Sequence, residues 1–344
     1  MRVTMRKRLG ACVRGAIAAA ALLIAGPLQA EVKLPNIFGD HMVLQQGQKN
    51  RVWGVAEPNE AVTVTIERQG EKQSHKATAG ADGKWQVTLD ALALGGPLEM
   101  TVQGKNTVKF ADVLVGEVWI CSGQSNMQWS VNASNDPDLE RAAANFPQIR
   151  MVNVPQVGTQ EPQWNFNGKW QVCTPETVGN FSAVGYFFGR QLHQTLKVPV
   201  GLINNAWGGS ACEAWVRRDL LAADAKYKPL LDRWSGMEAT FNELSAKTDL
   251  NEDQKKQLGG LRGQMAGNSR PGNIYNGVLK SHLGYGIRGA IWYQGESNAG
   301  RAYQYRDLFP LMIDSWRKEW AQGDFPFYWV QLADFMAEKP EPAD

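Results

Sequence analysis

An apolar run that stops at a turn of small and polar residues constrains this chain more than any other feature. Residues 113–120 are mostly apolar, and the turn CSGQSN follows directly. A buried strand that ends at Gly123 can bend tightly and aim the hydroxyl and the backbone N–H of Ser125 at one point. Two further apolar runs end in comparable segments, NNAWGGS at 204–210 and WYQGESN at 292–298. These three strand ends predict one shared site.

From about residue 113 the pattern alternates between strands and helices. The candidate strands are residues 113–121, 149–154, 199–204, 288–293 and 327–332. Between them, residues 181–196 and 305–316 carry apolar side chains at helical spacing. This alternation predicts an α/β fold, a doubly wound parallel sheet flanked by helices. Ligands of such sheets bind beyond the carboxyl ends of the strands, where the three segments lie.

The N-terminal part has a different pattern. Residues 31–110 contain short alternating runs separated by Gly, Pro and Asn, which predicts an accessory β-sandwich domain. We expect this domain to support the second domain at 111–344 rather than to bind carbohydrate. Within that second domain, residues 219–268 are polar and helix-favouring, so we expect a helical insertion that forms a solvated surface hairpin rather than a lid.

Residues 1–30 have the composition of a cleavable signal peptide. Five basic residues and no acidic ones accompany the apolar stretch 16–25, with Ala30 before the expected cut. The apolar stretch is shorter than the roughly 20 residues that span a membrane, so we expect no stable membrane insertion after signal removal. The expected location is periplasmic or secreted. The remaining chain has 31 basic and 34 acidic residues, which argues against binding to nucleic acid.

Aromatic and cysteine content narrow the chemistry further. Thirteen Trp in a nearly neutral chain suit a sugar ligand, because aromatic rings offer rigid contact area to apolar C–H faces. Cys121, Cys173 and Cys212 remain after signal removal, an odd number, and no spacing resembles a metal site. Cys121 is interpreted as a small apolar residue rather than a catalytic thiol, and a Cys121–Cys212 disulfide is the alternative pairing.

The three segments resemble the SGNH hydrolases, specifically the sialate O-acetylesterase branch, which includes acetylxylan esterases. The segment LPNIFGDHMVLQQ at 34–46 is also similar to that branch, and the resemblance extends to about residue 335. It implies a flavodoxin-like sheet and a carbohydrate O-acetylesterase that acts through an acetyl-Ser125 intermediate. The implied partner is an acetylated carbohydrate, either sialic acid or xylan, and no metal or organic cofactor is implied.

The resemblance also implies roles for individual residues. Ser125 is the candidate nucleophile, and the oxyanion donors are its own N–H, the N–H of Gly209 and the side-chain amide of Gln294. Asn298 is the fallback donor. Glu296 either orients a catalytic histidine or accepts backbone N–H bonds that hold its loop.

Candidate substrate contacts are Asn126, Trp215 and Asn298. Glu213 and Trp215 have a second interpretation, as residues that pack the loop. Other serines occur in the same three segments, namely Ser122, Ser210 and Ser297. Turn chemistry alone does not exclude them, and only the resemblance favours Ser125.

The general base is the unresolved part of the pattern. The family carries an Asp-x-x-His-Pro segment, and none of the four histidines, His41, His75, His193 and His282, matches it. The simplest expectation is that the hydrolase domain is C-terminally incomplete in this chain. A pseudo-esterase that binds carbohydrate without cleaving it is the alternative, and another short-chain esterase, lipase or thioesterase of the same fold is a third. If the base lies within this chain, His282 is the first candidate.

Overall fold

The computed structural model describes residues 31–333, and the predicted signal peptide lies outside this range. The chain from Glu31 onwards forms one compact unit. The expected border at residues 110/111 is not a break in the chain's structure, because it falls inside a single long strand, β7 (Thr107–Gly123). Within residues 31–333, no helix is both long enough and apolar enough to cross a bilayer.

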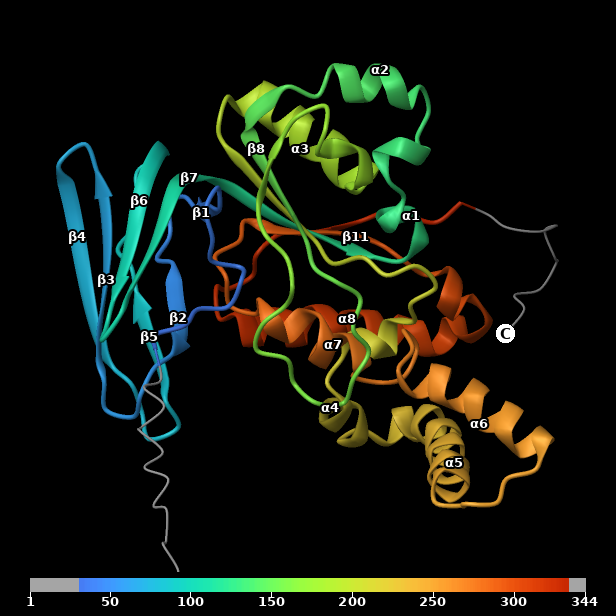
Figure 1. Ribbon diagram of the computed structural model, residues 1–344. Coiled ribbons are helices and arrows are strands. Elements are labelled where there is room, and N and C mark those ends of the chain that lie inside the picture. Colours follow the sequence, from blue (N-terminus) through green and yellow to red (C-terminus); the bar gives the residue numbers. More distant parts are fainter. Residues whose placement is uncertain (1–30, 334–344) are drawn as a thin grey trace, which may run out of the picture. The chain divides into compact units, whose positions relative to one another are not determined.

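The N-terminal residues form strands, as the sequence predicts (Figure 1). Side-chain exposure alternates along several of them. β3 shows the pattern clearly, with Val62, Val64 and Ile66 buried and the intervening residues more exposed. Antiparallel pairing gives the order β4-β3-β6-β7, while β2 and β5 form a separate two-stranded ladder. The strands are β1 (Val43–Gln45), β2 (Arg51–Val55), β3 (Ala61–Arg68), β4 (Glu71–Thr78), β5 (Lys84–Thr88) and β6 (Gly95–Gln103).

β7 joins the N-terminal strands to the sheet that carries the site. Its first part pairs with β6 from Thr107 to Val115, and residues 114–116 pair in parallel with β1. Its last part pairs in parallel with β10 and β11. Side-chain exposure alternates along the first part of β7, and every residue from Val113 onwards is buried. This pattern is expected for a strand that belongs first to a sheet with one solvated face and then to a sheet covered on both faces.

The second sheet has the order β9-β8-β10-β7-β11-β12, and every pairing in it except β8–β9 is parallel. All five predicted strands are present, and β9 was not predicted. The order differs from the flavodoxin order, since the first strand, β7, lies between the third and fourth rather than between the second and third. The bounds are β8 (Phe146–Asn153), β9 (Gln171–Cys173), β10 (Val200–Asn204), β11 (Gly289–Tyr293) and β12 (Phe327–Trp329).

Helices cover both faces of this sheet (Figure 1). α3 (Ala183–Leu196) lies on one face and packs near Trp119 and Cys121, while α8 (Ala302–Trp320) lies on the other with Val118 and Ile120. Alternate residues of β7 therefore feed two different cores. The remaining α-helices are α1 (Ser125–Gln128), α2 (Pro137–Ala142), α4 (Arg218–Ala222), α5 (Lys228–Ser245), α6 (Glu252–Met265) and α7 (Asn273–Gly277).

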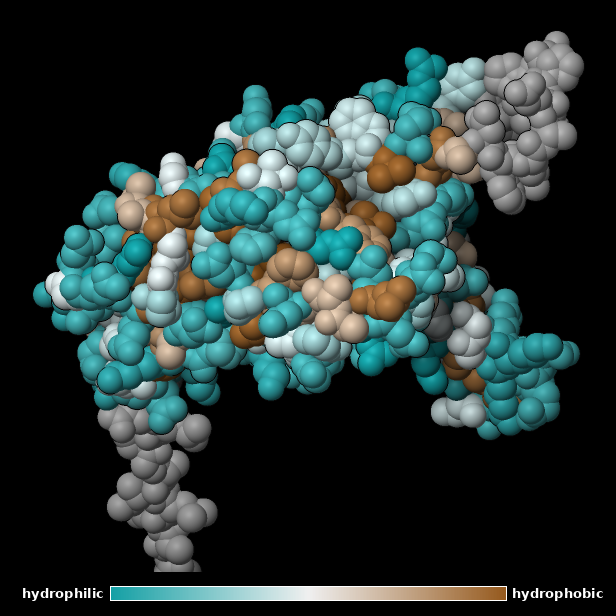
Figure 2. Space-filling model, turned by 90° about the horizontal axis from the view of Figure 1, so that it is seen from above, coloured by the Kyte–Doolittle hydropathy of each residue, from teal (hydrophilic) through white to brown (hydrophobic). Residues whose placement is uncertain are grey.

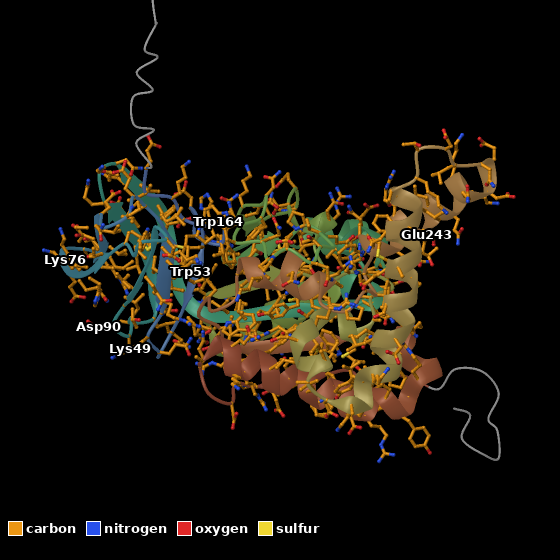
Figure 3. All side chains as sticks on the ribbon, turned by 90° about the horizontal axis from the view of Figure 1, so that it is seen from below. Lys49, Trp53, Lys76, Asp90, Trp164 and Glu243 are labelled. Carbon is orange, nitrogen blue, oxygen red and sulfur yellow. The ribbon has the colours of Figure 1, made fainter. Side chains whose placement is uncertain are left out.

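α5 and α6 form a polar hairpin that projects from the rest of the unit. In Figure 2 the projecting lobe is mostly teal, and most α6 side chains are exposed. α6 begins at a capping box in which Asn251 and Gln254 satisfy each other's backbone N–H groups. Such a helix is stabilised locally, which suits a hairpin with little core of its own. Figure 3 shows Glu243 on this hairpin, far from Trp53 and Trp164, which line a common cavity beside β2.

Candidate active site

Ser125 lies where β7 ends and α1 begins. Gly123 has a φ of +138°, and a Cβ there would lie 2.2 Å from the carbonyl oxygen of Tyr293, so only glycine fits this turn. The next N–H, of Gln124, donates to the same Tyr293 oxygen at 2.8 Å. The turn is thus clamped to the end of β11, and Ser125 is exposed. The predicted tight turn at Gly123 is confirmed.

The segment after β10 lies against this turn. The N–H of Trp207 donates to the Gly123 oxygen at 2.9 Å. The N–H of Gly208 donates to Gln128 Oε1 at 2.5 Å, and a Cβ on Gly208 would lie 3.6 Å from Ser125 Cα. The sequence predicts a role for Gly209 and none for the adjacent Gly208. The contact with Ser125 gives Gly208 its importance, and the sequence carries no signal for that contact.

The segment after β11 completes the assembly. Gln124 Oε1 accepts from the N–H groups of Gly295 and Ser297 at 3.4 and 3.3 Å. Asn126 Nδ2 donates to Glu296 Oε1 at 2.9 Å. The three sequence segments therefore meet around α1, and Asn126, a candidate substrate contact, is half-buried and takes part in this tie.

Glu296 occupies the start of a short 3₁₀-helix, η6 (Glu296–Arg301), and is exposed. Two roles were considered for it from the sequence, and its one hydrogen bond in the described chain is different from both. It accepts from the Asn126 side chain, so it links η6 to α1. The backbone N–H bonds expected for Glu296 are accepted by Gln124 instead.

Gln294 and Asn298 are buried, unlike the exposed Ser125. Gln294 is 3% exposed, and its amide donates to the Ser210 carbonyl at 3.0 Å and to Asn298 Oδ1 at 2.7 Å. Asn298 Oδ1 also accepts from the N–H of Cys212 at 2.9 Å. Both N–H groups of Gln294 are therefore engaged between the second and third segments.

Trp215 is fully buried and does not line the cavity beside Ser125, so of its two interpretations loop packing is the one observed. Its Nε1 donates to Ser210 Oγ at 3.2 Å, and its ring lies edge-on to Trp292 at 5.5 Å. Glu213, also fully buried, accepts from Asn298 Nδ2 at 2.8 Å and from Arg301 at 2.8 Å. A buried carboxylate needs such partners. These residues brace the loops from below.

The other serines are placed differently from Ser125. Ser122 is fully buried and donates to Asn205 Oδ1. Ser210 is fully buried and lies 3.3 Å from the Gly123 oxygen, to which it donates. Ser297 is partly buried. Ser125 is thus the exposed serine of the three segments.

Within the described range, each of the four histidines has its ring engaged elsewhere. The nearest recorded partners are Asp112 at 2.7 Å for His41, Gln73 at 2.8 Å for His75, the Val198 carbonyl at 2.8 Å for His193 and Asn205 at 3.2 Å for His282. His282 is fully buried, and burial lowers its pKa to about 3, so its imidazole is neutral at neutral pH.

The cysteines in residues 31–333 are free and buried. The alternative Cys121–Cys212 disulfide is therefore not formed. Burial raises the pKa of the Cys121 thiol, and it raises the pKa of Cys173 to about 12. Neither is a reactive thiolate, and the interpretation of Cys121 as a small buried residue is confirmed.

A cavity of about 580 Å³ opens directly beside Ser125. Residues after β8 and β10 and the segment that follows α1 line it, and Trp129 is its large aromatic side chain, 55% exposed. An exposed hydroxyl next to a cavity of this size can meet a substrate larger than an acetyl group.

Comparison with known proteins places this geometry in a family. The family model of carbohydrate esterases, described as sialic acid-specific acetylesterase, matches residues 115–246 and 265–343. The gap between the two matched stretches coincides with the α5–α6 turn and α6.

Curated relatives agree with that match. The sialate O-acetylesterase of Mus musculus is 32% identical over 332 residues, covering 88% of this chain and 60% of its own length. That of Homo sapiens is 30% identical over 336 residues, covering 89% of this chain and 58% of its own length. The chain thus spans about three-fifths of these relatives.

A solved structure shares the fold. The crystal structure of a carbohydrate acetylesterase from Xanthomonas citri superposes with a TM-score of 0.69 at 35% identity, covering 88% of this chain and 60% of that one. The family match, the relatives and this structure agree with one another. The chain belongs to the carbohydrate esterase family of sialic acid-specific acetylesterases.

Proposed function

We propose that this protein is a carbohydrate O-acetylesterase in which Ser125 is the nucleophile. One observation carries the proposal: three segments distant in sequence converge on an exposed serine at the carboxyl edge of a parallel sheet, beside a cavity. The Ser125 oxygen attacks the acetyl carbonyl, the sugar hydroxyl leaves, and water then releases acetate from the acetyl-serine.

The tetrahedral intermediate carries a negative oxygen that needs fixed donors. In residues 31–333, no acceptor is recorded for the backbone N–H groups of Ser125 and Gly209, so both are available. Gly209 is exposed and has a φ of +73°, which suits close approach of a ligand to the backbone. We place these two donors first. Gln294 remains a third candidate, since its amide must first leave Ser210 and Asn298.

The base that deprotonates Ser125 is not assigned, because all four histidines have other partners. The reactivity of Ser125 should therefore be tested under conditions in which deprotonation by a side chain is not limiting. A fluorophosphonate probe is reacted with the protein at pH 9, with and without added imidazole. Labelling is expected on the peptide that contains Ser125 and should be abolished by Ser125→Ala.

Ser297→Ala is the matched control, because Ser297 lies in the neighbouring segment and is only partly buried. It should label like the wild-type protein. Label on Ser122, Ser210 or Ser297, or equal labelling of Ser125→Ala, would reassign the nucleophile. Acetylated-sugar binding without labelling under any condition would favour the non-catalytic carbohydrate-binding alternative.

Two further expectations remain proposals. We keep residues 31–110 as an accessory β-sandwich that supports the catalytic sheet, and contacts such as Tyr285 Oη to the Val43 carbonyl, 2.8 Å, favour support. We also keep a periplasmic or secreted location, which depends on the composition of residues 1–30. Sequencing the N-terminus of the mature protein from a cell fraction tests the second proposal.

A further inference from the structure

The cavity beside Ser125 is lined without charge. Among the described residues that form its wall, none is acidic or basic. The polar groups are hydroxyls and side-chain amides, contributed mainly by the ends of β8 and β10 and by the loops near α1. This wall differs from a site for an anionic sugar, in which a carboxylate is normally met by Arg or Lys.

Hydrogen bonds hold the amides of this wall in place. Asn204 Nδ2 donates to Asn153 Oδ1 at 2.8 Å, and Gln156 Nε2 donates to the Ala206 carbonyl at 3.2 Å. Asn153 and Gln156 are both exposed. Each amide has a donor and an acceptor, which matches sugar hydroxyls that both donate and accept. The wall is therefore built for hydroxyls.

Trp129 supplies an apolar surface at the same place. It is 55% exposed, although its Nε1 donates to the Ala133 carbonyl at 2.5 Å and its N–H donates to the Ser125 carbonyl at 2.8 Å. These bonds fix the ring while leaving much of it open. A fixed, exposed ring four residues from the nucleophile can stack on the C–H face of a pyranose.

The hydrogen bonds of α1 include one to an acidic side chain, which does not favour an anionic ligand. Glu296 is hydrogen-bonded to Asn126 in α1 and is exposed. The nearby cation Arg301 is paired with the buried Glu213 at 2.8 Å. A ligand carboxylate in this cavity would thus lose water and gain no cation from the described residues that line it.

We propose, on the basis of the esterase function proposed above, that the site takes a neutral O-acetylated sugar residue rather than acetylated sialic acid. Trp129 stacks on the sugar face, and the amides of Asn153 and Gln156 bind its hydroxyls. The family name points to a sialic acid, whereas this chain's own cavity selects against its carboxylate.

The test measures binding, so that its result does not depend on which residue is the base. The Ser125→Ala variant of the whole chain is titrated by calorimetry with three probes: an O-acetylated xylo-oligosaccharide, the methyl glycoside of 9-O-acetyl-N-acetylneuraminic acid, and the methyl ester of that same glycoside. The neutral oligosaccharide should bind most tightly. The ester should bind at least about 10-fold more tightly than the acid, because only the carboxylate differs.

Two variants sharpen the result. Trp129→Ala should weaken binding of the oligosaccharide by about 10-fold. Trp164→Ala is the matched control. Trp164, which is labelled in Figure 3, is 48% exposed but lines the cavity beside β2 rather than the cavity beside Ser125. Gln156→Arg should selectively strengthen binding of the acid.

An acid that binds as tightly as its ester, or no binding by any of the three probes, would overturn the neutral-sugar proposal. Equal weakening by Trp129→Ala and Trp164→Ala would do the same. Failure of the esterase function appears elsewhere, as loss of fluorophosphonate labelling at Ser125, so the two failures are distinguishable.

Discussion

The middle of β7 and its C-terminal end are built from different kinds of polar group. In the middle, where the N-terminal strands meet the second sheet, Asp112 pairs with Arg150 at 2.7 Å and Glu117 pairs with Arg288 at 2.6 Å. At the C-terminal end the groups around Ser122 and Ser125 are hydroxyls and amides, and the buried His282 is neutral. Charge gathers where the two sheets join and is scarce beside the nucleophile.

This difference separates stability from chemistry. Each of these pairs has one buried partner, Arg150 or Glu117, and a buried charge is costly when its partner is removed, so each pair links two parts of the chain. Neutral amides can donate N–H groups to an ester, and they add no net charge to the site. Changes in the charged middle of β7 should therefore affect folding, and changes at its neutral end should affect reactivity.

The largest effect is expected from Gly116→Ala, midway along β7. A Cβ at Gly116 would lie 2.0 Å from the Pro199 carbonyl oxygen, and backbone cannot move aside as a side chain can. We expect a loss of at least about 3 kcal/mol in the free energy of unfolding, or no folded protein. Urea denaturation measures it, with Gly236→Ala, which has open space, as control. Equal midpoints for both variants would mean that β7 tolerates separation from the segment before β10.

Arg288→Met should come next and should spare the site. It leaves Glu117, whose side chain is 7% exposed, with Gln46 and Gln45 as its partners within residues 31–333. Because the Arg288 side chain is 44% exposed and water screens the pair, we expect a loss of about 1–2 kcal/mol at pH 7. The rate of fluorophosphonate labelling at Ser125 should not change. A variant as stable as the wild type but slower to label would mean that this ion pair acts on reactivity rather than on folding.

The same pair has a pH signature. Burial raises the pKa of Glu117, but hydrogen bonds from Arg288 and Gln46 outweigh it, and the net pKa is below its ordinary value of 4.5. The stabilisation is therefore complete above that value and is lost as pH falls through the lowered pKa. Without Arg288 the folded pKa of Glu117 moves back towards or above 4.5, so this part of the acid loss of stability should shrink or disappear, as followed by denaturation between pH 7 and 3.

Gly208→Ala should affect reactivity rather than folding. The added Cβ would lie 3.6 Å from Ser125 Cα and 2.9 Å from Gln128 Oε1, which is the end of a flexible side chain. We expect the added methyl group to displace Ser125 and so to slow its labelling by roughly 10²-fold. The free energy of unfolding should be nearly unchanged. Gly300→Ala in η6, where a Cβ meets nothing within 4 Å, is the matched control. If both variants label at the wild-type rate, Gly208 has no part in positioning Ser125.

His282→Gln should have the smallest effect at neutral pH. The folded pKa of about 3 lies below the ordinary 6.5, so the unfolded chain binds the extra proton between these values. Stability should thus fall as pH drops from 6.5 towards 3 in the wild type, and this part of the slope should vanish in the variant. The labelling rate at Ser125 should be unchanged. A large drop in that rate would identify His282 as the base.

Much of the framework could be predicted because it depends on local pattern. Alternation with period two predicted the strands before β7, and apolar runs ending in small residues predicted the ends of β7, β10 and β11. The turn at Gly123 could be predicted because glycine readily adopts a positive φ. The structure adds the close approach of Tyr293, which leaves no room for a side chain there. The convergence of the three segments also followed from parallel strands sharing one edge.

The tertiary structure decided which partner each polar side chain has. Gln294 bonds to Ser210, Glu213 to Arg301, and Glu296 to Asn126, across 84, 88 and 170 residues of chain. Trp215 belongs to the core rather than the cavity because Trp292 and Trp316 lie against it. Periodicity encodes which face of an element is buried, but it does not encode which distant residue occupies the other side of a contact. For that reason the sequence alone determined the edge of the sheet where the site lies, and only the packed chain determined that its cavity is neutral and that Gly208 lies against Ser125.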